Sequence, residues 1–75
     1  MNSDLAKRFG EILRTERKKA ELSQEGLAFE CDLDRTYISL LERGLRQPSL
    51  ETVFLLADSL GLSASKLVSK VENDR

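Results

Sequence analysis

The feature that most restricts the fold of this sequence is a series of helix start and stop signals along its 75 residues. Apolar residues recur every three or four positions in five segments, which is the spacing of helices that bury one face. A serine or an aspartate precedes each segment as an N-cap, and a glycine follows two of them as a stop signal. The expected helices cover about residues 4–19, 24–31, 35–43, 50–60 and 64–71. Because no stretch alternates as a strand does, the sequence predicts an all-α fold of five helices in one domain over residues 1–75.

Composition excludes several classes of protein. With no histidine and a single cysteine, Cys31, the chain lacks the side chains for an intrachain disulfide or a metal site. We interpret Cys31 as a small buried apolar residue rather than a redox sensor. The sequence also has no glycine-rich phosphate loop, so we expect no catalytic residue, no cofactor and no enzymatic activity. No apolar run is long enough to span a membrane and no secretory signal is evident, so we expect a cytoplasmic protein.

Residues 24–43 carry the clearest functional pattern. Two short helices joined by a tight turn at residues 32–33 have the spacing of a helix-turn-helix. The second helix is held by apolar residues and places Arg35, Thr36 and Ser39 on its other side. The major groove of DNA admits one such recognition helix with its N-terminal residues against the base edges, where arginine on guanine is the commonest specific contact. The sequence therefore indicates a sequence-specific DNA-binding domain.

This segment and its flanks resemble the lambda-repressor-like helix-turn-helix family, which includes phage repressors, Cro proteins and XRE-type regulators. The resemblance covers roughly residues 5–62 and rests on Leu22-Ser23-Gln24-Glu25, Leu27-Ala28, Leu33-Asp34-Arg35-Thr36-Tyr37-Ile38-Ser39, Leu41-Glu42-Arg43-Gly44 and Pro48-Ser49-Leu50-Glu51-Thr52. Within the family, the run from Leu33 to Ser39 and the chain length are similar to the controller proteins of restriction–modification systems. Those proteins are small homodimers that activate or repress their own operon. The resemblance implies double-stranded DNA and a second copy of the chain as partners, with RNA polymerase as a further partner of an activator.

The resemblance also gives roles to individual residues. The family's base-contacting positions match Arg35, Thr36 and Ser39. The positions that contact the DNA backbone or groove match Gln24, Tyr37, Arg43, Arg46 and Gln47. An ion pair that ties the first helix to the third matches Arg17 and Glu42. Asp32 replaces the usual turn glycine, and aspartate tolerates the left-handed conformation that the turn needs. Leu40 is apolar where the family is often polar or small, and it either contacts a thymine methyl group or has no role.

The two C-terminal helices, within residues 50–71, carry more apolar residues than one buried stripe requires. Surplus apolar surface on a soluble domain usually marks a protein interface. A two-fold homodimer is the commonest assembly of this kind, and it suits a palindromic operator. The expected interface residues are Phe54, Leu55, Val68 and Val71.

A protein-interaction module or an antitoxin of the same fold is the alternative interpretation. Such a protein does not need Arg35, Thr36 and Ser39 to face a groove. Steeply salt-dependent binding to one duplex over others distinguishes the two functions, because phosphate contacts release counterions from DNA.

Overall fold

The structure, a computed structural model, describes residues 2–73 as helices joined by short loops. In chain order the helices are α1 (Asn2–Lys19), α2 (Gln24–Cys31), α3 (Arg35–Glu42), α4 (Leu50–Ser59) and α5 (Ala64–Asn73). The described residues contain five helices and no strand, which confirms the predicted all-α class. The differences lie at the helix ends. The first helix begins two residues before its predicted start, so Ser3 lies inside α1 instead of preceding it, and α5 continues two residues beyond its predicted end.

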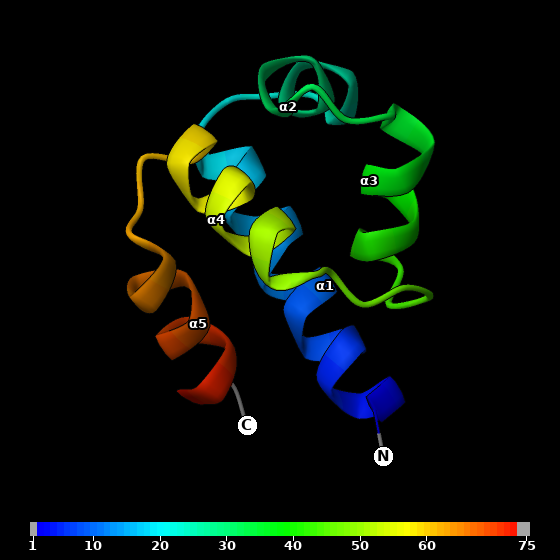
Figure 1. The fold of residues 1–75 in the computed structure, drawn as a ribbon, viewed down its shortest axis with the longest axis vertical. Helices are drawn as coiled ribbons and strands as arrows, with labels where there is room; N and C mark the ends of the chain where they lie inside the picture. Colours follow the sequence, from blue (N-terminus) through cyan, green and yellow to red (C-terminus); the bar gives the residue numbers. More distant parts are fainter. Residues whose placement is uncertain (1, 74–75) are drawn as a thin grey trace.

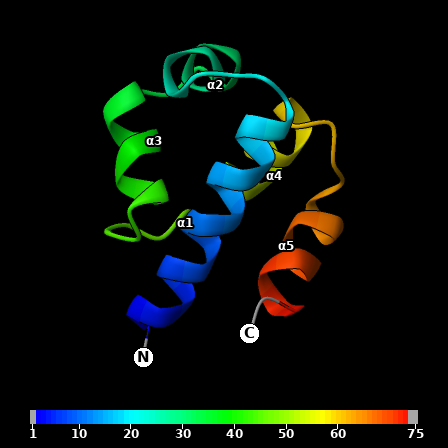
Figure 2. The same ribbon diagram turned by 180° about the vertical axis from the view of Figure 1, so that it is seen from behind.

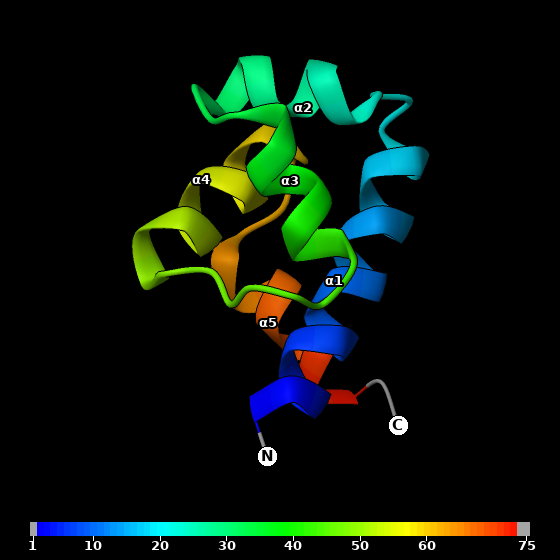
Figure 3. The same cartoon turned by 90° about the vertical axis from the view of Figure 1, so that its right-hand side faces the viewer.

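The helices pack around α1, the longest of them (Figure 1). Seen from behind, α1 lies between α3 and α5 (Figure 2). The recognition helix α3 packs on α1 and α2, while α4 packs between α2 and α5. In the side view, α2 crosses above α3, and the loop that follows α3 runs below it to the start of α4 (Figure 3). The helix-turn-helix therefore forms one side of the bundle, and α4 and α5 form much of the other.

Four helices begin at the caps that the sequence predicts. The side-chain oxygens of Ser23, Asp34, Ser49 and Ser63 accept hydrogen bonds from backbone N–H groups in the first turns of α2, α3, α4 and α5, respectively, over 2.9 to 3.3 Å. Each of these bonds satisfies an N–H group that the helix itself leaves unpaired. The start of the recognition helix is therefore set by a local signal, Asp34.

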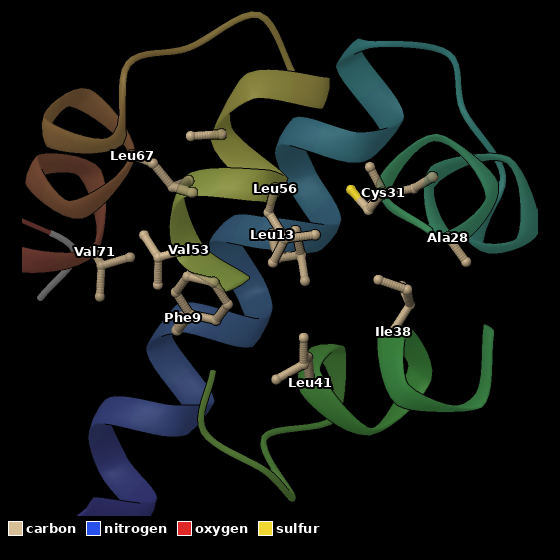
Figure 4. Packing of buried hydrophobic residues seen from close by; sticks show 12 residues of the cluster. Phe9, Leu13, Ala28, Cys31, Ile38, Leu41, Val53, Leu56, Leu67 and Val71 are labelled. Carbon is tan, nitrogen blue, oxygen red and sulfur yellow. The ribbon is translucent and has the colours of Figure 1, made fainter. Parts of the chain in front are cut away.

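Every helix contributes side chains to the hydrophobic core. Its completely buried large side chains are Leu13, Leu27, Ile38, Leu41, Leu56 and Leu67. In Figure 4, Leu13 and Leu56 lie at the centre, with Ile38 and Leu41 of α3 on one side and Leu67 of α5 on the other. Burial of this apolar surface is the main stabilising contribution in a domain of this size. It also fixes which face of α3 remains available to a partner.

Cys31 is buried where α2 meets α4, in agreement with the sequence interpretation. Its Sγ atom lies 3.1 Å from the Ser59 hydroxyl oxygen. Burial raises the pKa of the Cys31 thiol, and the hydrogen bond to Ser59 offsets only part of this effect. Since the thiolate is the reactive form, a raised pKa suits a packing role.

Among residues 2–73, no single helix is long and apolar enough to cross a membrane, and the consecutive helices α4 and α5, which reach that length together, are bent by 103°.

Gly10 marks a close approach of α1 to α3. A Cβ atom at this position would stand 2.6 Å from the Glu42 carbonyl oxygen and closer still to that of Leu41. Both oxygens belong to the backbone of the last turn of α3, which cannot move aside as a flexible side chain does. Gly10 therefore allows the recognition helix to lie directly against α1.

Replacing Gly10 by alanine should lower the free energy of unfolding by about 2 kcal/mol, because overpacking against backbone outweighs the roughly 1 kcal/mol that alanine gains over glycine in a helix. Thermal unfolding followed by circular dichroism measures the change. Gly26→Ala is the matched control, since a Cβ atom there meets only side-chain atoms, at 3.3 Å or more. Its effect should stay within about 1 kcal/mol. Equal stability of the two variants would contradict the role given to Gly10.

Candidate nucleic-acid interface

The recognition helix α3 is anchored by one face and open on the other. Ile38 and Leu41 are fully buried, whereas Arg35 and Thr36 are exposed and Ser39 is half-buried. Residues three or four positions apart are neighbours on a helix surface, so the three expected base-contacting residues share one face. The packing of α3 thus leaves a face with one guanidinium and two hydroxyl groups accessible.

Two other side chains of α3 are less accessible. Tyr37 is half-buried and packs against the core cluster, so only part of its ring is free for a DNA backbone. Leu40, for which the sequence left two roles open, is also half-buried.

The turn between α2 and α3 holds its shape with aspartate in place of glycine. Asp32 has φ 57° and ψ 41°, which is the left-handed conformation. The N–H group of Leu33 donates to the Ala28 carbonyl oxygen over 2.8 Å, and that of Asp32 donates to Phe29 over 3.2 Å. These bonds satisfy carbonyl groups at the end of α2 and hold the turn that leads into α3 in one conformation.

Arg17 and Glu42 form the ion pair that the resemblance implies. Arg17 Nε donates to Glu42 Oε2 over 2.6 Å, and Arg17 Nη2 donates to Glu42 Oε1 over 3.1 Å. A third bond runs from Arg17 Nη1 to the Leu22 carbonyl oxygen over 2.8 Å. The two side chains are only 10% and 3% exposed. This pair ties the C-terminal end of α3 to α1.

Gln24, the expected phosphate contact at the start of α2, also belongs to this cluster. Its Nε2 donates to Glu42 Oε1 over 3.0 Å. Its Oε1 accepts a hydrogen bond from Arg35 Nη1 over 3.3 Å. Neither contact is predictable from the sequence, because both join helices whose relative placement no local pattern defines. The amide of Gln24 therefore connects the buried ion pair to the exposed arginine of the recognition helix.

The loop after α3 presents Arg43, Arg46 and Gln47 at the surface. Gly44 of this loop has φ 74°, and its Cα packs so closely on Lys7 that a Cβ atom would stand 2.9 Å from the Lys7 Cα. The sequence gives no indication of this contact, because nothing in it relates Lys7 to position 44. The structure thus packs the backbone and the Cγ atom of Lys7 against the loop expected to contact phosphates.

A family model named helix-turn-helix matches residues 13–67, which is more than half of the chain. The chain belongs to the helix-turn-helix family of DNA-binding regulators. Its relatives include the control protein C.BamHI of Bacillus amyloliquefaciens, which is 44% identical over 69 residues that cover 91% of this chain and 85% of the relative. The control protein C.MunI of Mycoplasma sp is 42% identical over 73 residues, or 96% and 99% of the two chains. Among solved structures, the restriction–modification controller protein C.AhdI of Aeromonas hydrophila matches with a TM-score of 0.80 at 42% identity, over 83% of this chain and 94% of that one.

In this helix-turn-helix protein, the four expected interface residues line two hollows, Phe54 and Leu55 one and Val68 and Val71 the other. Phe54 and Leu55 are 60% and 39% exposed and line a hollow of about 430 Å³ between α4 and the start of α5. Val68, which is 48% exposed, lines a different hollow between α5 and α1.

Val71 corrects the sequence analysis. It is only 5% exposed and belongs to the core, so it has little surface to offer a partner. The spacing of α5 contains the signal that was overlooked. Leu67 and Val71 are four positions apart and share the inner face, whereas Val68 lies outside it.

Proposed function

We propose that this chain is a transcriptional regulator that binds a palindromic operator as a homodimer and controls the genes of a restriction–modification system. The observation that carries this proposal is an anchored recognition helix whose free face presents Arg35 and Thr36. The similarity to C.BamHI and C.MunI, which are named control proteins, supports the regulatory role. The similarity to C.AhdI, a restriction–modification controller protein, supports the link to restriction–modification. The proposed role is binding without catalysis or cofactor, in the cytoplasm.

The short recognition helix favours a dimer. A helix of eight residues contacts only a few base pairs, which are too few to select one operator from a genome. A net charge of −1 also gives the chain little nonspecific attraction to DNA. Two copies related by a two-fold axis would set their α3 helices about 34 Å apart, on successive turns of one face of the duplex. The binding free energies of the two half-sites then add in one complex.

Two single substitutions should distinguish the residue that reads bases from the residue that binds phosphates. Arg35→Ala should lose about 1–3 kcal/mol of discrimination at one base pair of each half-site, because a bidentate contact to a base edge is removed. Arg46→Ala should weaken binding to all duplexes and reduce the salt slope by about one per lost phosphate contact. Fluorescence anisotropy with a selected duplex and its single-base-pair variants, at several salt concentrations, measures both effects.

The outcomes that contradict these assignments are distinct. If Arg35→Ala keeps the full preference for the selected duplex, Arg35 does not read bases. If the unmodified chain prefers no duplex and its binding does not depend on salt, the proposed DNA-binding function is wrong and the protein-interaction module becomes the better interpretation.

RNA polymerase is a further proposed partner, and α2 offers a surface of suitable chemistry. Phe29 is 86% exposed, and Glu25 and Glu30 beside it are exposed as well. Residues 20–34 contain five acidic residues and no lysine or arginine, so the exposed side of α2 around Phe29 favours a basic protein. An exposed aromatic ring among charges is a common anchor in protein interfaces.

Phe29→Ser should therefore reduce activation about tenfold while operator affinity stays within about twofold, because the ring is an anchor for the polymerase alone. In vitro transcription from the operator-containing promoter, with the Kd for the same DNA measured in parallel, tests this. If the Phe29→Ser variant activates transcription fully, α2 is not the contact surface for RNA polymerase.

A further inference from the structure

Polar side chains from three helices form one continuous hydrogen-bonded chain at the base of the recognition helix. Arg17 of α1 and Gln24 of α2 both donate to the Glu42 carboxylate of α3, over 2.6 and 3.0 Å. Arg35 donates in turn to the Gln24 carbonyl oxygen over 3.3 Å. One end of this chain is the buried ion pair, and the other end is the exposed arginine expected to read bases.

The two neighbours of Gln24 fix the orientation of its amide. A glutamine side chain carries a donor and an acceptor of nearly equal size, so its shape alone does not decide which way round the amide lies. The Glu42 carboxylate only accepts hydrogen bonds, so the Gln24 NH2 group must face it. The Arg35 guanidinium only donates, so it requires the carbonyl oxygen. The charge on Glu42 therefore turns the Gln24 oxygen towards Arg35.

We propose that Glu42, acting through the Gln24 amide, is a positioning residue for Arg35 and so contributes to sequence discrimination. The proposal rests on the DNA-reading role proposed above for Arg35. Glu42 itself has no access to DNA, because its side chain is 3% exposed. The bond to Gln24 engages one of the guanidinium's five N–H groups, which leaves the others free for a base edge.

Positioning of this kind acts on discrimination more than on general affinity. An arginine that is already held loses less side-chain freedom when it meets its base than a free one does. The benefit falls on the base pair that Arg35 reads, since contacts to phosphates carry no sequence information. A purely structural Glu42 would instead change stability and affect all duplexes alike.

The test compares Kd values for two kinds of duplex. The first is the duplex that the unmodified chain recovers from a random-sequence library, and the second is the same duplex changed at the base pair that Arg35→Ala no longer distinguishes. Glu42→Gln should lower the ratio of the two Kd values about fivefold, the equivalent of one net hydrogen bond. The new amide has a single acceptor oxygen, whereas Arg17 donates to both oxygens of Glu42. With that oxygen on Arg17 Nε, which makes the shorter bond, the NH2 group faces Gln24, and Gln24 then reverses and turns its own NH2 group towards the Arg35 guanidinium, donor against donor.

A second substitution should restore discrimination. Gln24→Glu, added to Glu42→Gln, returns an acceptor to the position facing Arg35 and gives the NH2 group of the new amide an acceptor. The ratio should return to within about twofold of the unmodified value. Affinity for all duplexes should fall, because a carboxylate is added where a phosphate is expected to bind.

Phe9→Leu serves as the stability control. Phe9 is buried on the side of the core that α4 and α5 cover (Figure 4). This variant should unfold at a lower temperature with an unchanged Kd ratio. A folded Glu42→Gln variant with an unchanged ratio, or a folded double variant that stays at the lowered ratio, would overturn the positioning role. An unmodified chain that recovers no preferred duplex would instead defeat the DNA-binding function on which the proposal rests.

Discussion

Glu42→Ala should lower the free energy of unfolding by about 3–5 kcal/mol, because it leaves the Arg17 guanidinium buried without its counter-charge. A chain of 75 residues has a total stability of only about 4–11 kcal/mol, so the loss is a large fraction of the whole. The midpoint of thermal unfolding should fall by roughly 20–30 °C. Circular dichroism at several urea concentrations provides the free energy, and the slope of the transition checks that the variant still unfolds in one step.

Two further variants distinguish a buried pair from charge in general. Asp4→Ala removes the partner of Arg8 in a surface pair whose closest atoms are 4.0 Å apart and whose aspartate is 83% exposed, and it should change stability by less than about 1 kcal/mol. Arg17→Met combined with Glu42→Leu replaces both buried charges by apolar side chains and should recover most of the lost stability. If the Glu42→Ala variant has the same free energy of unfolding as the unmodified chain, the ion pair does not anchor α3.

The features that the sequence predicts well are local ones. The serine and aspartate caps of α2 to α5 lie next to the turns that they close, and their hydrogen bonds form as expected. The left-handed turn at Asp32 is likewise a property of one residue and its neighbours. The Arg17–Glu42 pair was expected only through the family resemblance, since its members are 25 positions apart.

The features that the sequence did not reveal depend on how the helices cross. The contact of Gly10 with the end of α3, the packing of Lys7 on Gly44 and the link from Gln24 to Arg35 all join different helices or a helix and a loop. Hydrophobic periodicity defines which face of a helix is buried, but it does not define the distance or angle to the next helix. Val71 was assigned to an interface because apolar character alone does not say whether a side chain meets its own core or another copy.

The hollow lined by Phe54 and Leu55 is the surface on which the proposed dimer is best tested. Phe54→Glu and Leu55→Glu should each give a folded monomer, because association would bury an unpaired carboxylate. Operator affinity should then fall about 100-fold or more, since the second half-site no longer adds to the first. Sedimentation at micromolar concentration, far-ultraviolet circular dichroism and operator binding together measure assembly, folding and function.

Val68→Glu tests whether the separate hollow between α5 and α1 belongs to the same interface. We expect this variant to weaken dimer formation less than Phe54→Glu does, because Val68 and Phe54 line different hollows. Phe29→Ser is the matched control, because it removes a ring that is more exposed than Phe54, at 86% against 60%, from the outer side of α2. That variant should remain a dimer, which would show that exposed apolar surface alone does not drive association. An unmodified chain that sediments as a monomer yet binds a single half-site tightly would contradict the dimer. Phe54→Glu and Leu55→Glu variants that both remain dimers would instead move the interface away from α4.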